Sequence, residues 1–180
     1  MSEQDDRNFM RYLIGLREHD QRAALAALRR GLGKPPGSEP LAYPYVVPKL
    51  PDDLRCDDDE APYYLVGSLF ALHPVDTTAG NMGNHLRDLA RQTGADEPPP
   101  NIERRFVLLL SSHPRDLYKL LQPAVNLLKA GNVPIHWFQL LRDLKYWQHS
   151  DSRSDVRREW ATSFWRHEHQ PSVSPQSNRS

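Results

Sequence analysis

Rows of basic residues at helical spacing are the feature of this chain that most directly suggests a chemistry. Arg115, Lys119, Gln122, Asn126 and Lys129 fall at i, i+4, i+7, i+11 and i+14, which places them on one stripe of a helix. Such rows bind phosphate backbones because each contact releases a condensed counterion and the contacts sum. If ~6 of these residues bound phosphates, the affinity would fall roughly a thousandfold between 50 and 200 mM salt.

Further basic residues lie on the polar sides of other predicted helices, away from their apolar faces. Arg29 and Arg30 follow Arg22 at i+7 and i+8. The alternative is that these rows are ordinary solvated helix surfaces. The residues predicted to bind nucleic acid are Arg22, Arg29, Arg30, Arg104, Arg105, Arg115, Lys119, Lys129, Arg142, Lys145 and Arg157.

The charge distribution favours a polyanionic partner. Residues 101–180 carry 12 Lys+Arg against 7 Asp+Glu, whereas residues 1–100 carry 11 against 16. A formal net charge of +0 therefore hides a basic half joined to an acidic half. Such asymmetry indicates a charged macromolecule more than a small substrate.

Familiar catalytic and metal-binding patterns are missing. His19-Asp20 resembles the paired dyad of metal-dependent phosphohydrolases, but Asp20 is better explained as a helix cap. His167 and His169 flank Glu168, and i, i+2 ligands on a helix do not converge on one ion. No phosphate-binding loop, dinucleotide fingerprint or nucleophile elbow occurs. We expect a protein that is not an enzyme and has no metal or cofactor.

Helical periodicity accounts for most of the chain. Phe9, Tyr12, Leu13 and Leu16 give the apolar face of a first helix, and a second runs from a cap at Asp20 to the glycines near 31–33. Residues 41–50 predict a short or broken helix because two prolines interrupt them, and residues 52–60 predict an acidic loop. Residues 61–72 are apolar nearly all round, which predicts a central helix. A further helix follows Asn81.

The second half predicts four more helices, which would begin at Asn101, at Pro114, at Pro134 and before Val156. Pro123 lies inside the second of these and predicts a kink. The aromatic residues of the last two helices fit core packing better than base stacking, because they follow the apolar faces; they are Trp137, Trp147, Trp160 and Phe164. Tyr146 and Trp165 lie off these faces.

The predicted fold is all-α, with two small helical bundles joined by a short proline-rich linker at residues 94–100. We expect an N-terminal bundle over residues 1–98, a C-terminal bundle over 99–168 and a disordered tail over 169–180. The single Cys56, the acidic N-terminus and the absence of a long apolar stretch favour a cytoplasmic protein.

Several segments, taken in order, resemble the CasB family, the small subunit of the type I-E CRISPR surveillance complex Cascade. They are Leu28-Arg29-Arg30-Gly31, Ile102-Glu103-Arg104-Arg105-Phe106, Leu127-Leu128-Lys129, Val133-Pro134-Ile135, Asp143-Leu144 with Trp147, and Trp160 with Phe164. The similarity covers residues 8–166, with a weak match over 34–80.

The resemblance implies an all-α, non-catalytic subunit whose basic surface contacts guide RNA and target DNA and steadies the displaced strand. Its implied partners are the backbone subunits and a second copy of itself. Arg29, Arg30, Arg104 and Arg105 lie in the matching motifs, whereas the other basic residues rest on helix geometry alone. The competing hypotheses are a helical protein–protein adaptor with a basic docking face and, third, a hydrolase built on the His19-Asp20 dyad.

Overall fold

The computed structural model describes residues 3–54, 56–94 and 97–166, and the predicted tail and the His167-Glu168-His169 group lie outside these residues. Within them the structure is helical, and its sole bridge is an isolated pair, Asp76 with Ile135. The elements are α1 (Glu3–Glu18), α2 (Arg22–Arg29), η1 (Pro40–Ala42), α3 (Tyr43–Val46), η2 (Val47–Lys49), α4 (Asp57–Leu72), α5 (Met82–Arg91), α6 (Pro100–Ser111), η3 (Pro114–Asp116), α7 (Leu117–Ala130), α8 (Trp137–Gln148) and α9 (Ser150–Trp165). The all-α prediction is confirmed.

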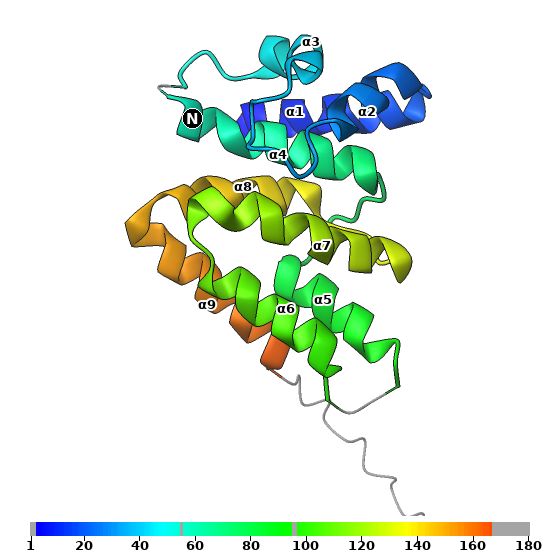
Figure 1. Cartoon of the computed structure of the whole chain (residues 1–180), viewed down its shortest axis with the longest axis vertical. Coiled ribbons are helices and arrows are strands. Elements are labelled where there is room, and N and C mark those ends of the chain that lie inside the picture. Colours follow the sequence, from blue (N-terminus) through cyan, green and yellow to red (C-terminus); the bar gives the residue numbers. More distant parts are fainter. Residues whose placement is uncertain (1–2, 55, 95–96, 167–180) are drawn as a thin grey trace, which may run out of the picture.

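The helices lie in tiers along the long axis of the molecule (Figure 1). Helices α1 to α4 occupy one end, α5, α6 and α9 occupy the other, and α7 and α8 lie between them. The buried apolar side chains of the described residues form one cluster that runs through all three tiers. Helix α4 packs against α2, α3, α7 and α8, which confirms the central position predicted from its apolar surface. None of the helices in the described residues is long and apolar enough to cross a membrane.

Contacts between helices cross the predicted division at residue 98, so the two-bundle arrangement stays a prediction. Helix α5 packs against α9, and α8 packs against both α1 and α4. Gly83 makes the first of these contacts possible, because a Cβ at this position would lie 2.0 Å from the carbonyl oxygen of Trp160. Asn81 adds a hydrogen bond from its Nδ2 to Ser163 Oγ at 3.0 Å.

Helix α5 begins with a capping box, in which the Asn81 and Asn84 side chains each accept a bond from the other's backbone N–H. The predicted caps of two other helices are wrong. Asp20 does not cap α2; its carboxylate accepts from the Arg22 guanidinium. Residue Asn101 lies inside α6, which begins at Pro100 after the N-cap Pro99. Pro114 begins a 3-10 turn that leads into α7.

Helix α8 begins at Trp137 rather than at the predicted Pro134. The preceding segment is extended because it pairs with the α4–α5 connection: Ile135 N donates to Val75 O at 3.1 Å, and Thr77 N donates to Ile135 O at 3.2 Å. The His136 N–H donates to Nε2 of the buried His85 at 3.0 Å. Burial, with His136 as a smaller cause, lowers the pKa of His85 to about 4, so this ring is a neutral acceptor near pH 7.

A buried carboxyl group joins α8 to α9. Asp143 Oδ2 accepts from Trp160 Nε1 at 2.6 Å, and Asp143 Oδ1 accepts from Gln139 Nε2 at 2.7 Å. Burial raises the pKa of Asp143 to about 6, although both hydrogen bonds act in the opposite direction. The folded protein therefore holds a proton on Asp143 more tightly than the unfolded chain does.

The raised pKa of Asp143 predicts a pH-dependent stability. The contribution of this group to the free energy of unfolding is complete below pH 3.8, its ordinary pKa, and is lost as the pH rises to about 6. The variant Asp143→Asn cannot ionise, and its amide oxygen still accepts from Trp160. The free energy of unfolding of this variant minus that of the natural protein should therefore increase by on the order of 3 kcal/mol over this range. Urea unfolding at several pH values measures the difference, and a difference that does not vary with pH would contradict the prediction.

Candidate nucleic-acid interface

Helices α6 and α7 pack together and direct five exposed basic side chains outward from their own surfaces and from the η3 turn. We call this set the basic face; its members are Arg104, Arg105, Arg115, Lys119 and Lys129. Their helices turn the apolar faces inward: Phe106 and Leu109 on α6 and Leu121 and Leu128 on α7 are buried. Helix amphipathicity therefore places these cations at the surface, as the sequence predicted.

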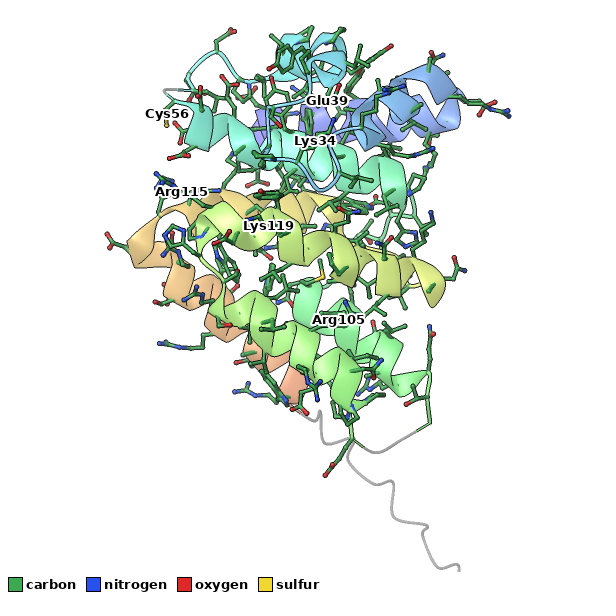
Figure 2. The ribbon with its side chains drawn as sticks, viewed as in Figure 1. Lys34, Glu39, Cys56, Arg105, Arg115 and Lys119 are labelled. Carbon is green, nitrogen blue, oxygen red and sulfur yellow. The ribbon has the colours of Figure 1, made fainter. Side chains whose placement is uncertain are left out.

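A groove of about 550 Å³ runs between α6, α7 and the loop that follows α2. Arg105 and Lys119 line it together with the amides Gln122 and Asn126. Gly33 forms the opposite wall with a φ of +73°, and a Cβ there would lie 3.4 Å from Gln122 Oε1. Figure 2 shows Arg105, Lys119 and Arg115 along the side that α6 and α7 present to the viewer. Cations and amide groups in one open groove are suited to phosphate oxygens and base edges.

Most members of the basic face form no ion pair among the described residues. Lys119 Nζ lies 2.9 Å from Asp116 Oδ1, and this pair lowers the pKa of Asp116. Both side chains are exposed, so the pair is weak and can exchange for a phosphate contact. The other four cations make no ion pair with any residue in the described ranges. They are Arg104, Arg105, Arg115 and Lys129.

The basic residues of α2 are divided between different roles. Arg22 is tied to Asp20, with its guanidinium 2.9 Å from the carboxylate. Arg29 Nε donates to Ala71 O at 2.6 Å, at the last turn of α4, where a cation stabilises the carbonyl end of a helix. Arg30 is exposed at the C-cap of α2. Of the three, Arg30 is the cation most available for a ligand.

The His19-Asp20 pair is engaged in local contacts. His19 Nδ1 lies 2.8 Å from Gly15 O, and Asp20 holds Arg22. Among the described residues, no three His, Cys, Asp or Glu side chains are grouped so that they could hold a metal ion. The geometry therefore gives the hydrolase hypothesis no support.

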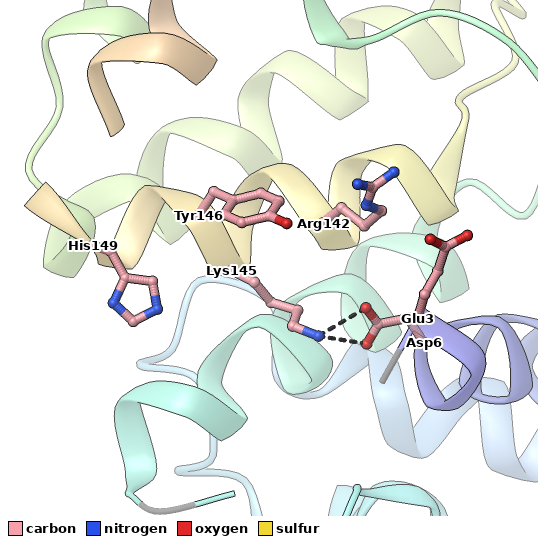
Figure 3. A pocket seen from close by; sticks show the side chains of 6 residues that line it. All are labelled: Glu3, Asp6, Arg142, Lys145, Tyr146 and His149. Carbon is pink, nitrogen blue, oxygen red and sulfur yellow. Dashed lines mark hydrogen bonds and ion pairs between the residues drawn. The ribbon is translucent and has the colours of Figure 1, made fainter. Parts of the chain in front are cut away.

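Lys145 is not on an exposed face, and this part of the prediction is wrong. Its Nζ lies 2.7 Å from both carboxylate oxygens of Asp6, and the two side chains are only 10% and 5% exposed (Figure 3). Tyr63 donates to Asp6 Oδ1 at 2.6 Å, and burial together with that carboxylate raises the pKa of Tyr63. Helices α1, α4 and α8 thus meet at one buried ionic contact.

Arg142 and Arg157 are also less exposed than the helical spacing predicted. Arg142 is half-buried, with its guanidinium carbon 5.9 Å from the centre of the Phe138 ring. The Arg157 side chain donates to Ser112 O at 2.5 Å and lies over the Trp147 ring at 5.3 Å. Arg157 therefore fastens α9 to the end of α6 and is not free to follow a nucleic-acid strand.

The prediction that four aromatic residues pack in the core is confirmed. Trp137, Trp147, Trp160 and Phe164 are buried. Trp165 is 38% exposed, and its Nε1 donates to Glu103 Oε1 at 3.0 Å.

Sequence reasoning missed two arginines on α1. Arg7 and Arg11 occur at i and i+4 on the polar side of that helix, which is the signal that could have identified them. Both line a groove with Arg142.

Replacing Lys145 with methionine should destabilise the fold without weakening nucleic-acid binding by the folded protein. The variant Lys145→Met leaves the Asp6 carboxylate buried with Tyr63 as its remaining donor, which costs about 3–5 kcal/mol. The double variant Asp6→Leu with Lys145→Met removes both charges and should recover most of that loss. Urea unfolding measures the stability. Reduced affinity for single-stranded DNA with unchanged stability would show that Lys145 is a surface contact instead.

Comparison with known sequences agrees with the resemblance noted above. The profile of the family described as CRISPR-associated protein Cse2 matches residues 24–165. A relative with that description, from Thermus thermophilus, is 36% identical over 145 residues, which is 79% of either chain.

Solved structures give the same result. The crystal structure of CasB from Thermus thermophilus has a TM-score of 0.75 at 28% identity, covering 89% of this chain and 97% of that one. The crystal structure of M. ruber CasB has a TM-score of 0.71 at 27% identity, with coverages of 89% and 92%. A chain of a CRISPR RNA-guided surveillance complex has a TM-score of 0.76 at 27% identity, with coverages of 90% and 92%. The resemblance to the CasB family is confirmed, and the chain belongs to the CRISPR-associated Cse2 family.

Proposed function

We propose that this chain is a non-catalytic small subunit of the type I-E Cascade surveillance complex. Its role is to bind guide RNA, target DNA and the displaced strand without reading their sequence. Membership of the Cse2 family supports the assignment, as does the likeness to a chain of an RNA-guided surveillance complex. The proposed partners are the other subunits of that complex, including its backbone subunits and a second copy of this chain, in the cytoplasm.

The observation that carries the nucleic-acid role is the basic face. It gathers exposed cations from two helices beside an open groove, and four of the five make no ion pair within the described residues. Arginine suits this task because its guanidinium forks onto phosphate oxygens and stays charged. The groove holds amides but no exposed aromatic stacking platform among its lining residues, which fits binding to a backbone rather than to particular bases.

Such binding would stabilise the state in which the target DNA duplex is opened and paired with the guide RNA. Exchange of a DNA duplex for a guide–target heteroduplex is nearly balanced, so a few kcal/mol decide whether the opened state persists. Cations that hold the displaced strand supply free energy of that size and slow its return to the complementary strand. The protein needs no reacting group for this purpose, only a stable row of charges.

The proposal predicts steeply salt-dependent binding of a random single-stranded DNA. Five contacts on the basic face would give a slope of about −3.5 in log affinity against log salt, or roughly a hundredfold loss between 50 and 200 mM. The double variant Arg104→Glu with Arg105→Glu removes two contacts, so its slope should fall to about −2. Fluorescence anisotropy with a labelled oligonucleotide measures both slopes.

The matched control is Arg11→Glu with Arg142→Glu, which makes the same change of charge on α1 and α8. This control should keep the natural salt slope and an affinity within about twofold, since neither residue belongs to the basic face. If the folded natural protein does not bind the oligonucleotide at about 50 mM salt, the adaptor hypothesis replaces the nucleic-acid role.

A further inference from the structure

Helices α1 and α8 lie side by side and leave a long open groove between their outer surfaces. Two hollows of about 600 and 320 Å³ share Arg142 and together follow the length of α8. Arg7, Arg11 and Ile14 line the groove from α1, and Phe138, Arg142 and Tyr146 line it from α8. Figure 3 shows the smaller hollow, with Glu3 at the start of α1 facing Arg142 on α8. We call this surface the α1–α8 groove; it shares no lining residue with the groove of the basic face.

The floor of the α1–α8 groove is apolar. Met10 is buried, and Ile14 and Phe138 are half-buried. The Arg7 guanidinium covers one side of the Phe138 ring, with its carbon 4.5 Å from the ring centre. Tyr146, at the other end, is 47% exposed. The groove thus offers apolar contact along its base and an exposed aromatic ring at one end.

The carboxylates of the groove are already engaged. Glu3 binds Arg7, Asp6 binds Lys145, and Glu18 lies 3.3 Å from Arg17. Burial raises the pKa of the fourth, Asp76, and the nearby backbone N–H of Trp137 acts in the opposite direction.

Two cations of the groove have no such partner. Arg11 donates to Asn8, and Arg142 contacts the Phe138 ring and lies near enough to Glu3 to contribute to the lowered pKa of that carboxyl; neither arginine forms an ion pair within the part of the chain that the structure describes. These two guanidinium groups therefore have donors to spare for carboxylates of a ligand.

This combination fits a protein segment better than a nucleic acid. A phosphate chain laid along the groove would cover its apolar floor without burying an apolar group of its own. An amphipathic helix buries its apolar face on such a floor and places charged residues at the rim. Arginine, methionine and aromatic residues are also the types enriched in protein–protein interfaces.

We propose that the α1–α8 groove docks an acidic amphipathic helix of another protein subunit, with Arg11 and Arg142 binding its carboxylates. The inference rests on the proposed membership of the surveillance complex. It separates the arginines into two groups: those of the basic face serve nucleic acid, and those of the groove serve a protein neighbour.

The test is reconstitution of the complete complex from its purified subunits and guide RNA, with this chain in natural or variant form. The groove variant Arg11→Glu with Arg142→Glu should incorporate at least about tenfold less at equal concentration, because like charges then face each other across the interface. In isolation it should still bind the oligonucleotide within about twofold of the natural protein. The basic-face variant Arg104→Glu with Arg105→Glu should incorporate as the natural protein does but bind the oligonucleotide more weakly. Circular dichroism and thermal unfolding verify that each variant is folded.

A second measurement identifies the occupant directly. A photo-crosslinking residue replaces Thr78, which is exposed on the groove wall, or Asn126, which is exposed in the groove of the basic face. In the assembled complex, the first position should form an adduct with a protein subunit and the second an adduct with nucleic acid.

Each outcome decides the matter. Natural incorporation of the folded groove variant, or a crosslink from position 78 to nucleic acid, overturns the inference. A crosslink to a second copy of this chain overturns the choice of occupant. If the basic-face variant keeps its oligonucleotide binding while the groove variant fails to incorporate, the nucleic-acid role fails and the docking inference stands.

Discussion

Burial of helix α8 on several sides is the constraint on which the rest of the structure depends. The helix packs against α1, α4 and α9, and two of its polar side chains are buried with it. Lys145 meets Asp6 and Tyr63 on one side, and Asp143 meets Trp160 on another. Because an unpaired buried charge is costly, these contacts fix how α8 is rotated and which neighbours it accepts. The rotation in turn decides which residues of α8 line the α1–α8 groove.

The structure divides its cations by what lies beside them. On α6 and α7 the exposed basic side chains form one ion pair among the described residues, Lys119 with Asp116, which leaves the other cations available to a polyphosphate chain. On α1 and α8 the arginines lie among engaged carboxylates and above an apolar floor. Basic residues at the same helical spacing can therefore bind different ligands, depending on the side chains that surround them. The net charge of the chain gives no hint of this division.

Periodicity predicted the helices and the inward aromatic residues because burial of one apolar face decides where a helix packs. It failed where a distant segment overrides the local pattern. Pro134 looked like a helix start, but residues 133–136 are held extended by the connection before α5. Lys145 looked exposed because its partner Asp6 comes from a distant part of the sequence. The members of the basic face could be named from helix geometry, whereas the groove beside them could not, since Gly33 joins it from a loop far away in the chain.

The separation of Asp6 and Lys145, which lie 139 positions apart in the sequence, also bears on the order of events during synthesis. Helix α1 leaves the ribosome early and lacks its ionic anchor until α8 has emerged as well. Contacts that close such long loops form late, because the entropy of closing them must be overcome first. A nascent chain that stops before α8 would therefore present the inner side of α1 to solvent, a state that favours aggregation or chaperone capture. Completion of α8 is thus the step that gives α1 its ionic anchor.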